Sequence, residues 1–212
     1  MKKYLLIILA LACALQVRSQ RDTVTLVHEN YTTTYDTVLK YPVVVKLWET
    51  SAKDSCNSKL PRKDQFHYDP LLKNQTNTVK AYDNSGYDRG HMCPAASNEC
   101  SGKEVLTECF YMSNMAPQLH SLNAGDWKRL EVYTREEAIK FDSIRVWAGS
   151  VGVAKKVNGL SVPSQCWKVI HILKTNEWMA YIFDNTTTKQ IGLDPHKTTI
   201  DSIEKLTGFK FD

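Results

Sequence analysis

Polar residues of the kinds that move protons and bind phosphate are concentrated between Asp88 and Arg135. The imidazole of His91 titrates near neutral pH and can accept a proton there. The guanidinium groups of Arg89 and Arg135 match phosphate oxygens in charge and geometry. Hydrolysis of a phosphodiester needs an activated water, neutralised charge at phosphorus and a protonated leaving oxygen. This segment carries side chains suited to that chemistry.

Four motifs follow one another in this segment: DRGH at 88–91, SNMAPQ at 113–118, LNAGDW at 122–127, and the pair Glu131 and Arg135. In this order and at this spacing they resemble the DNA/RNA non-specific endonuclease family, the ββα-metal nucleases that include mitochondrial endonuclease G. Weaker similarity extends over most of the chain. The resemblance implies an α+β fold with the ββα-metal core. It also implies Mg²⁺, with Mn²⁺ as a possible substitute, and products that carry 5′-phosphates.

The resemblance makes His91 the general base and Asn123 the metal-binding residue. Mg²⁺ prefers oxygen ligands and keeps several waters, so one amide oxygen together with substrate phosphate can hold it. The alternative for His91 is a structural histidine. The alternative for Asn123 is a helix N-cap, a position where asparagine is favoured.

Asn123, Trp127, Glu131 and Arg135 recur every four residues, which predicts one stripe along a helix. The resemblance places Glu131 at the water shell of the metal or beside Arg135, and Arg135 at the scissile phosphate. An ordinary surface ion pair between Glu131 and Arg135 is the alternative.

Arg89 and Arg62 are the other cations that could stabilise charge at phosphorus. Arg89 could instead be structural and paired with a carboxylate, and the match around Arg62 is short. Asn114 resembles a family residue that shapes the substrate site, with turn stabilisation as its alternative. Asp88 is interpreted as structural.

The N-terminus has the features of an export signal. Lys2 and Lys3 precede a short apolar run, so we expect a signal peptide over residues 1–19 and a secreted or periplasmic protein. Lipidation at Cys13 is the alternative. No later stretch has the length of a membrane span. The remaining residues 20–212 form the expected single domain.

Charge and cysteine content constrain the domain further. Removal of residues 1–19 leaves 24 basic and 23 acidic residues, so a phosphate-binding surface must be a local cluster. Five cysteines remain, and an oxidising compartment favours one or two disulfides with a thiol left over. Three cysteines fall between Cys93 and Cys109, so we expect a bridge within this segment. Zinc binding there is disfavoured because the spacing matches no common zinc module.

Several elements must position the motifs. Helical spacing of apolar residues predicts a helix over 124–141. A second helix is expected to be capped by Asp201 and to end at Gly208. We expect His91 on or just after the first strand of a β-hairpin whose second strand is 110–114. β-branched and aromatic runs predict strands at 43–48, 143–153, 167–173 and 178–183.

The sequence therefore predicts a nuclease acting on DNA and RNA, with a homodimer possible by resemblance to the family. Two other functions stay open. One is a narrower phosphodiesterase on the same fold, and the other is an exported nucleic-acid-binding protein without catalysis.

Overall fold

The computed structural model describes residues 22–56, 60–61, 65–73, 75–185 and 191–211. The expected signal segment and Arg62 lie outside these residues. Within the described ranges, no helix has the length and apolarity that crossing a bilayer requires.

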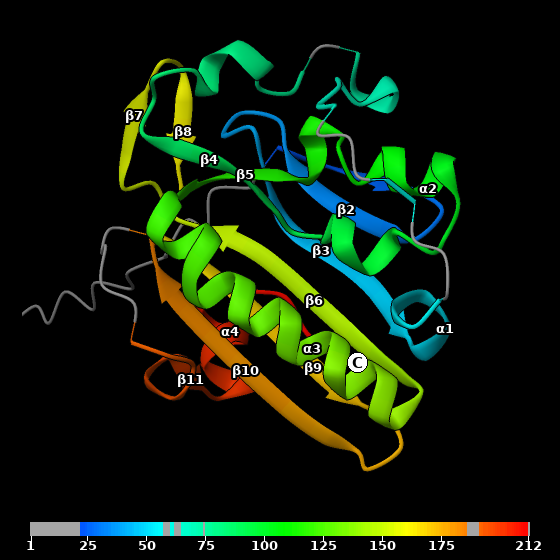
Figure 1. Ribbon diagram of the computed structural model, residues 1–212. Helices are drawn as coiled ribbons and strands as arrows, with labels where there is room; N and C mark the ends of the chain where they lie inside the picture. Colours follow the sequence, from blue (N-terminus) through cyan, green and yellow to red (C-terminus); the bar gives the residue numbers. More distant parts are fainter. Residues whose placement is uncertain (1–21, 57–59, 62–64, 74, 186–190, 212) are drawn as a thin grey trace, which may run out of the picture.

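A seven-stranded antiparallel sheet forms the centre of the structure, in the order β1-β2-β3-β6-β9-β10-β11 (Figure 1). The predicted strand at 43–48 is the middle of β3, and the three later strand predictions correspond to β6, β9 and β10. The polar segment after residue 20, which shows little periodicity, forms the first two strands. The strands are β1 (Thr23–Val27), β2 (Tyr31–Asp36), β3 (Tyr41–Thr50), β6 (Ser143–Val151), β9 (Gln165–Ile172), β10 (Glu177–Asp184) and β11 (Lys197–Thr198).

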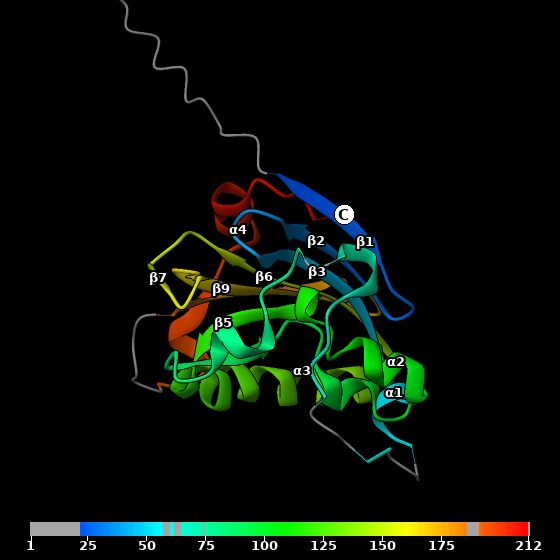
Figure 2. The same ribbon diagram turned by 90° about the horizontal axis from the view of Figure 1, so that it is seen from above.

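Helices cover both faces of this sheet, as Figure 2 shows with α3 on one side and α4 on the other. Alternation along β3 sends Val43, Val45 and Leu47 into the core beneath α3 and Val44 into the core on the other face. The combination of helices and antiparallel strands confirms the α+β prediction. The helices are α1 (Ser51–Asp54), α2 (Lys103–Glu108), α3 (Lys128–Phe141) and α4 (Ile200–Thr207), with short 3-10 turns at Pro70–Leu72, Val79–Tyr82, Ala95–Asn98, Met112–Asn114 and Asp194–His196.

Two small antiparallel ribbons complete the structure. One pairs β4 (Tyr87–His91) with β5 (Met115–Leu119), and the other pairs β7 (Lys155–Val157) with β8 (Leu160–Val162). In both views β5 lies on the face of the sheet that carries α3 (Figures 1 and 2). This arrangement places the end of β4 next to the start of α3.

The second strand of the ribbon corrects one prediction. His91 ends β4 as expected, but its partner is β5 and not residues 110–114. Phe110 and Met112 are apolar because they are buried in turns, and residues Met112–Asn114 form a 3-10 turn. β5 contains Pro117, a residue that occurs in sheets mainly on edge strands.

The two predicted helices differ in detail from expectation. Residues Leu122–Trp127 form a π-type turn, and Gly125 has a non-helical backbone, so the regular helix begins only at Lys128. The cap of α4 is Thr199 and not Asp201, because the Thr199 side chain accepts a hydrogen bond from the backbone N–H of Ser202. Gly208 ends α4 as predicted, with a left-handed backbone at φ 79°.

The prediction of a disulfide within the segment from Cys93 to Cys109 is wrong. The bridge joins Cys56 to Cys100, which lie in partly exposed loops. Cys93 and Cys109 are buried in the core and remain thiols, as does Cys166. Proximity in sequence therefore misled the assignment, because the partner of Cys100 lies 44 residues earlier.

Candidate functional site

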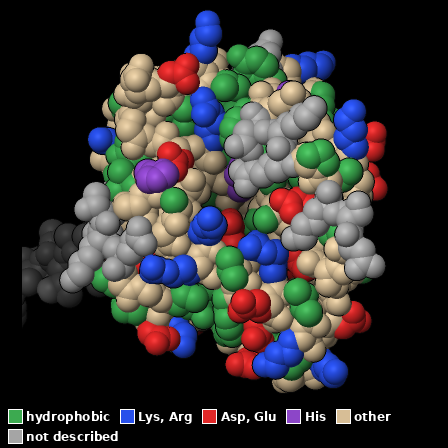
Figure 3. Space-filling model, in the orientation of Figure 1, with side chains coloured by type: hydrophobic (Ala, Val, Ile, Leu, Met, Phe, Trp, Pro, Cys, Tyr) green, Lys and Arg blue, Asp and Glu red, His purple; other side chains and the backbone are tan. Residues whose placement is uncertain are grey.

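A polar cavity of about 540 Å³ lies between β4, the turn that precedes α3, and α3 itself. Figure 3 shows basic side chains on either side of a hollow on this face of the molecule. The residues predicted to carry chemistry meet here from segments far apart in sequence. The lining includes Arg89, His91, Asn123, Lys128, Glu131 and Arg135.

His91 is held from its ring and from its backbone. Its ring packs edge-on against Phe110, with 5.3 Å between ring centroids, and lies 5.9 Å from Phe66. The indole Nε1 of Trp127 donates a hydrogen bond to the His91 carbonyl oxygen at 3.2 Å. These contacts fix the imidazole at the wall of the cavity.

The residue before His91 is Gly90, because a side chain at this position would collide with Gln118. A Cβ at this position would lie within 2.7 Å of three atoms of the Gln118 side chain. Gly90 and Ala116 face each other in the β4–β5 ribbon, and Gln118 follows two residues later on β5. Close packing of the DRGH and SNMAPQ motifs therefore requires glycine here.

Asn123 lies in the π-type turn and not on the regular helix, so the predicted stripe is interrupted at its first member. Its Nδ2 donates a hydrogen bond to Oδ2 of Asp88 at 2.9 Å. The Nδ1 atom of His120 lies 2.8 Å from the same carboxylate oxygen. Asp88, interpreted as structural from sequence, thus fixes the orientation of the Asn123 amide.

This orientation fits the cation that the family implies. With Nδ2 directed at Asp88, Oδ1 of Asn123 has no hydrogen-bond donor among the described residues and is available as an oxygen ligand. The described residues contain no group of three or more His, Cys, Asp or Glu side chains placed to hold a metal. A divalent cation at Asn123 would therefore take most of its ligands from water and substrate, as Mg²⁺ commonly does.

Glu131 and Arg135 line the same cavity from successive turns of α3. Burial raises the pKa of Glu131, while the positive charges of Lys168 and Arg135 act to lower it. The Nη1 atom of Arg135 is buried with no hydrogen-bond partner among the described residues. Such a donor suits a phosphate oxygen that enters the cavity.

Lys168 is a buried cation that sequence reasoning did not assign. Its side chain lies beneath the site on β9, with Nζ 4.4 Å from the centre of a Trp127 ring. Burial lowers the pKa of Lys168, and the carboxylates of Glu131 and Glu49 raise it. The residue balances negative charge beneath the cavity, and no local pattern in WKVI would have revealed this.

Two further carboxylates, Glu49 and Asp54, are buried next to this network. Oε2 of Glu49 and both carboxylate oxygens of Asp54 have no donor among the described residues. Burial, followed by the charge of Glu49, raises the pKa of Asp54 to about 8. Burial also raises the pKa of Glu49. A proton shared between the two side chains accounts for both observations.

Arg89 has contacts that agree in part with the structural role given above as its alternative. Its Nη2 donates to the Val79 carbonyl at 2.8 Å and lies 3.3 Å from Oδ1 of Asp83. The guanidinium also packs over the rings of Phe66 and Tyr82. Arg89 lines the cavity, yet its charge is already engaged by the protein.

Asn114 is not part of the cavity lining. It is fully buried, accepts from the Cys93 backbone N–H at 2.8 Å, and donates to the carbonyl oxygens of Cys93 and Cys109 at 2.8 and 2.9 Å. The structure thus corrects its assignment as a catalytic and substrate-binding residue and favours the turn-stabilising role. Its amide holds the segment after His91 against the end of α2.

Lys128 is a second residue that the sequence reasoning missed. It is exposed at the first position of α3 and lines the cavity together with Asn123 and Ala124. The sequence alone does not distinguish Lys128 from the adjacent cation Arg129. Only the structure shows that Arg129 pairs with Asp126 instead of lining the cavity.

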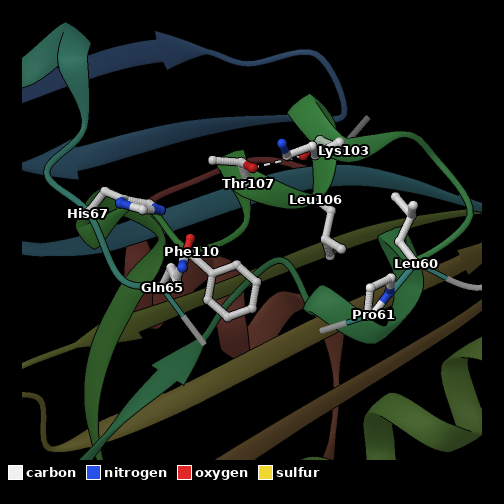
Figure 4. Close-up of a pocket in the computed structure, with 8 residues that line it drawn as sticks. All are labelled: Leu60, Pro61, Gln65, His67, Lys103, Leu106, Thr107 and Phe110. Atoms are coloured by element: carbon white, nitrogen blue, oxygen red, sulfur yellow. Dashed lines mark hydrogen bonds between the residues drawn. The ribbon is translucent and has the colours of Figure 1, made fainter. Parts of the chain in front are cut away.

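A smaller cavity of about 180 Å³ lies beside the site (Figure 4). Leu60, Pro61, Leu106 and Phe110 give it an apolar wall, and Phe110 also contacts His91. The described residues that line it include no carboxylate. The polar cavity is therefore the candidate functional site.

Comparisons with known proteins agree with this geometry. The mitochondrial nuclease EXOG of Xenopus laevis is 30% identical over 208 residues, which cover 86% of this chain and 56% of that protein. A nuclease of Serratia marcescens is 33% identical over 159 residues, or 66% of this chain and 58% of that protein. The chain thus spans little more than half the length of these relatives.

A solved structure shares the fold. The crystal structure of the EndoG/EndoGI complex contains a chain that superposes with a TM-score of 0.77 at 25% identity, covering 88% of this chain and 84% of that one. The profile of the DNA/RNA non-specific endonuclease family matches residues 11–212. The chain belongs to the DNA/RNA non-specific endonuclease family.

Proposed function

We propose that this protein is a Mg²⁺-dependent endonuclease that hydrolyses phosphodiester bonds in DNA and RNA and leaves 5′-phosphates. The observation that carries the proposal is the meeting of His91, Asn123, Glu131 and Arg135 in one polar cavity. Three of the four have a partner that suits the role: Trp127 for His91, Asp88 for Asn123, and the buried Lys168 for Glu131.

His91 accepts a proton from a water as that water's oxygen forms the new bond to phosphorus. The bond between phosphorus and the 3′ oxygen breaks, its electron pair stays on that oxygen, and a proton from solvent completes the alcohol. Arg135 donates hydrogen bonds to the phosphate oxygens, where negative charge develops. A divalent cation bound at Asn123 would supply positive charge that neutralises the phosphate. Glu131, which lines the same cavity, would orient water of that cation's shell.

Weak sequence preference follows from the lining. The groups aimed into the cavity are suited to phosphate and water, and contacts to phosphate carry no sequence information directly. The same lining accepts DNA and RNA, because none of these roles involves the 2′ position of the sugar.

The test is a gel assay of residues 20–212 on plasmid DNA and total RNA, with Mg²⁺ or with EDTA, beside His91→Ala. We expect both substrates to be degraded only by the unaltered protein with Mg²⁺, and at least a hundredfold slower by the variant. A folded protein that leaves both substrates intact would overturn the proposal.

The same assay separates the two other functions. A narrower phosphodiesterase would spare duplex DNA yet cleave small phosphodiesters or single strands. A non-catalytic binding protein would retard nucleic acid on the gel without cutting it. The arrangement of Asn123 against Asp88 argues for catalysis, since binding alone has no need of an amide oxygen directed into the cavity.

Export and assembly complete the proposal. Residues 1–19 would direct the chain out of the cytoplasm, and mass spectrometry of the exported protein would locate the cleavage point. A homodimer is proposed by analogy with the family, and light scattering on the purified protein would measure its mass.

A further inference from the structure

The β7–β8 ribbon packs beside Tyr82, a residue that lines the polar cavity. Leu160 of this ribbon is fully buried against Tyr82 and Met115, which belong to the wall behind the cavity. Nδ2 of Asn158 donates to the Asp83 carbonyl oxygen at 3.2 Å. These two contacts hold the ribbon in a fixed position beside β4 and β5.

Lys155 of this ribbon contacts a side chain of the cavity wall. Its Nζ lies 5.1 Å from the ring centre of Tyr87, and Tyr87 lines the cavity. Val157, on the same face of the strand, packs against the cluster that contains Tyr82. Lys156 lies between them and therefore points to the opposite face. Both lysines are exposed.

The positive charge of Lys155 is not neutralised by the protein. Among the described residues, neither Lys155 nor Lys156 forms an ion pair with a carboxylate, whereas the nearby Arg89 is engaged by Asp83. A lysine ammonium over an aromatic face keeps its donors available to solvent or to an anion. The chain carries a formal net charge of only +4, so such local charges decide where a polyanion binds.

Distance along β4 indicates which phosphate this cation can reach. Tyr87 and His91 are the two ends of β4, and an extended strand rises about 3.3 Å per residue, so they lie about 13 Å apart. The contact with Tyr87 therefore places the charge of Lys155 at the end of β4 opposite to His91. It is placed to contact another phosphate of the same nucleic acid.

We propose that Lys155, braced on the ring of Tyr87, is a binding subsite for a backbone phosphate that flanks the cleavage point. The inference rests on the proposed nuclease function and extends the substrate contact beyond the catalytic cavity onto the β7–β8 ribbon. It identifies the ligand as a nucleic-acid strand several nucleotides long, since a single nucleotide would not span both positions.

Binding of a short DNA duplex and of a single-stranded oligonucleotide tests the subsite. Kd is measured as a function of salt in a His91→Ala background, which prevents cleavage, for Lys155→Gln and for the matched control Lys156→Gln. We expect Lys155→Gln to reduce the slope of log Kd against log salt by about 0.9 for the duplex and about 0.7 for the single strand. Affinity at low salt falls about fivefold, while Lys156→Gln leaves slope and affinity unchanged.

The outcomes separate the subsite from the nuclease proposal. Equal slopes for the two variants, whether both unchanged or both reduced, would overturn the subsite, because they would indicate no contact or a diffuse field. Lys155→Arg should restore the slope, since it restores the charge. Failure of the unaltered protein to cleave any nucleic acid would instead overturn the proposed function. Both lysines are exposed, so unchanged thermal midpoints are expected and confirm that the fold is intact.

Discussion

The two faces of the central sheet are buried to a similar degree but by different kinds of side chain. Beneath α3, the core includes the charged residues Glu49 and Lys168, each 1% exposed. Beneath α4, the core consists of apolar and aromatic side chains, among them Trp147, Trp167 and Ile203. Both faces draw on the same strands, since Lys168 is flanked by Trp167 and Val169 on β9.

The difference shows where this fold accepts a cost in stability. Burial of charge is expensive unless partners compensate it, whereas burial of apolar surface is favourable. The charged residues lie beneath the face that bears the polar cavity, where Lys168 acts on the ionisation of Glu131. The α4 face has no such task and is packed for stability. Substitutions on the two faces should therefore separate activity from stability.

The largest effect is expected on the α3 face. Glu131→Gln should reduce kcat about a thousandfold, because it removes the negative charge that faces the cavity. The thermal midpoint should change by only a few degrees. Steady-state kinetics on DNA and a thermal melt measure the two quantities. Glu136→Gln, exposed on the same helix, is the control, and equal activity of the two variants would contradict the assignment.

On the α4 face the opposite separation is expected. Ile203→Ala should lower the free energy of unfolding by about 3 kcal/mol, because it opens a cavity in a fully buried site. Activity per folded molecule at low temperature should be unchanged. Urea denaturation gives the stability, and Leu206→Ala, at a 37% exposed position of the same helix, should cost much less. A loss of kcat in Ile203→Ala would show that the two faces are not independent.

A smaller effect concerns pH. The pKa of Asp54, about 8 in the folded protein, exceeds its ordinary value of 3.8, so the folded state holds a proton that the unfolded state releases. The resulting stability is present below about pH 4 and is lost as pH rises to about 8, with a slope of at most about 1.4 kcal/mol per pH unit. Asp54→Asn should reduce this slope.

Calorimetry between pH 5 and 8 measures the effect, with the exposed Asp22→Asn as its control. Glu49 retains a contribution of the same sign, so some slope should remain in Asp54→Asn. An unchanged slope in this variant would exclude a shared proton as its source.

Regular elements with strong periodicity were predictable from the sequence. The β-branched run VVVKLW predicted β3, and the apolar spacing from Trp127 to Phe141 predicted the helix that carries Glu131 and Arg135. Glu131 and Arg135 are four residues apart, so they lie on successive turns of the same helix face, and both line the cavity. The residues of DRGH and LNAGDW were also brought together, as the family resemblance implied.

The errors arose where tertiary contacts decide the structure. Asn114 was assigned to the substrate site, but its amide bonds the backbone of residues distant in sequence. The strand β5 was missed because a proline interrupts it and the adjacent apolar residues belong to turns. Lys168 was not recognised, because it acts on Glu131, which lies more than 30 residues away. Asp88 was interpreted as structural, but its partner Asn123 was not predicted, since it also lies more than 30 residues away.

The contact between Gly90 and Gln118 has a consequence for how this protein can change over generations. The side chain of Gln118 occupies the space that any larger residue at position 90 would need. A replacement of Gly90 becomes sterically acceptable only after Gln118 has itself become smaller, so the order of the two substitutions matters. The DRGH and SNMAPQ motifs, which are separated by more than 20 residues, are therefore expected to change together. His91 follows Gly90 directly, so its position depends on both motifs.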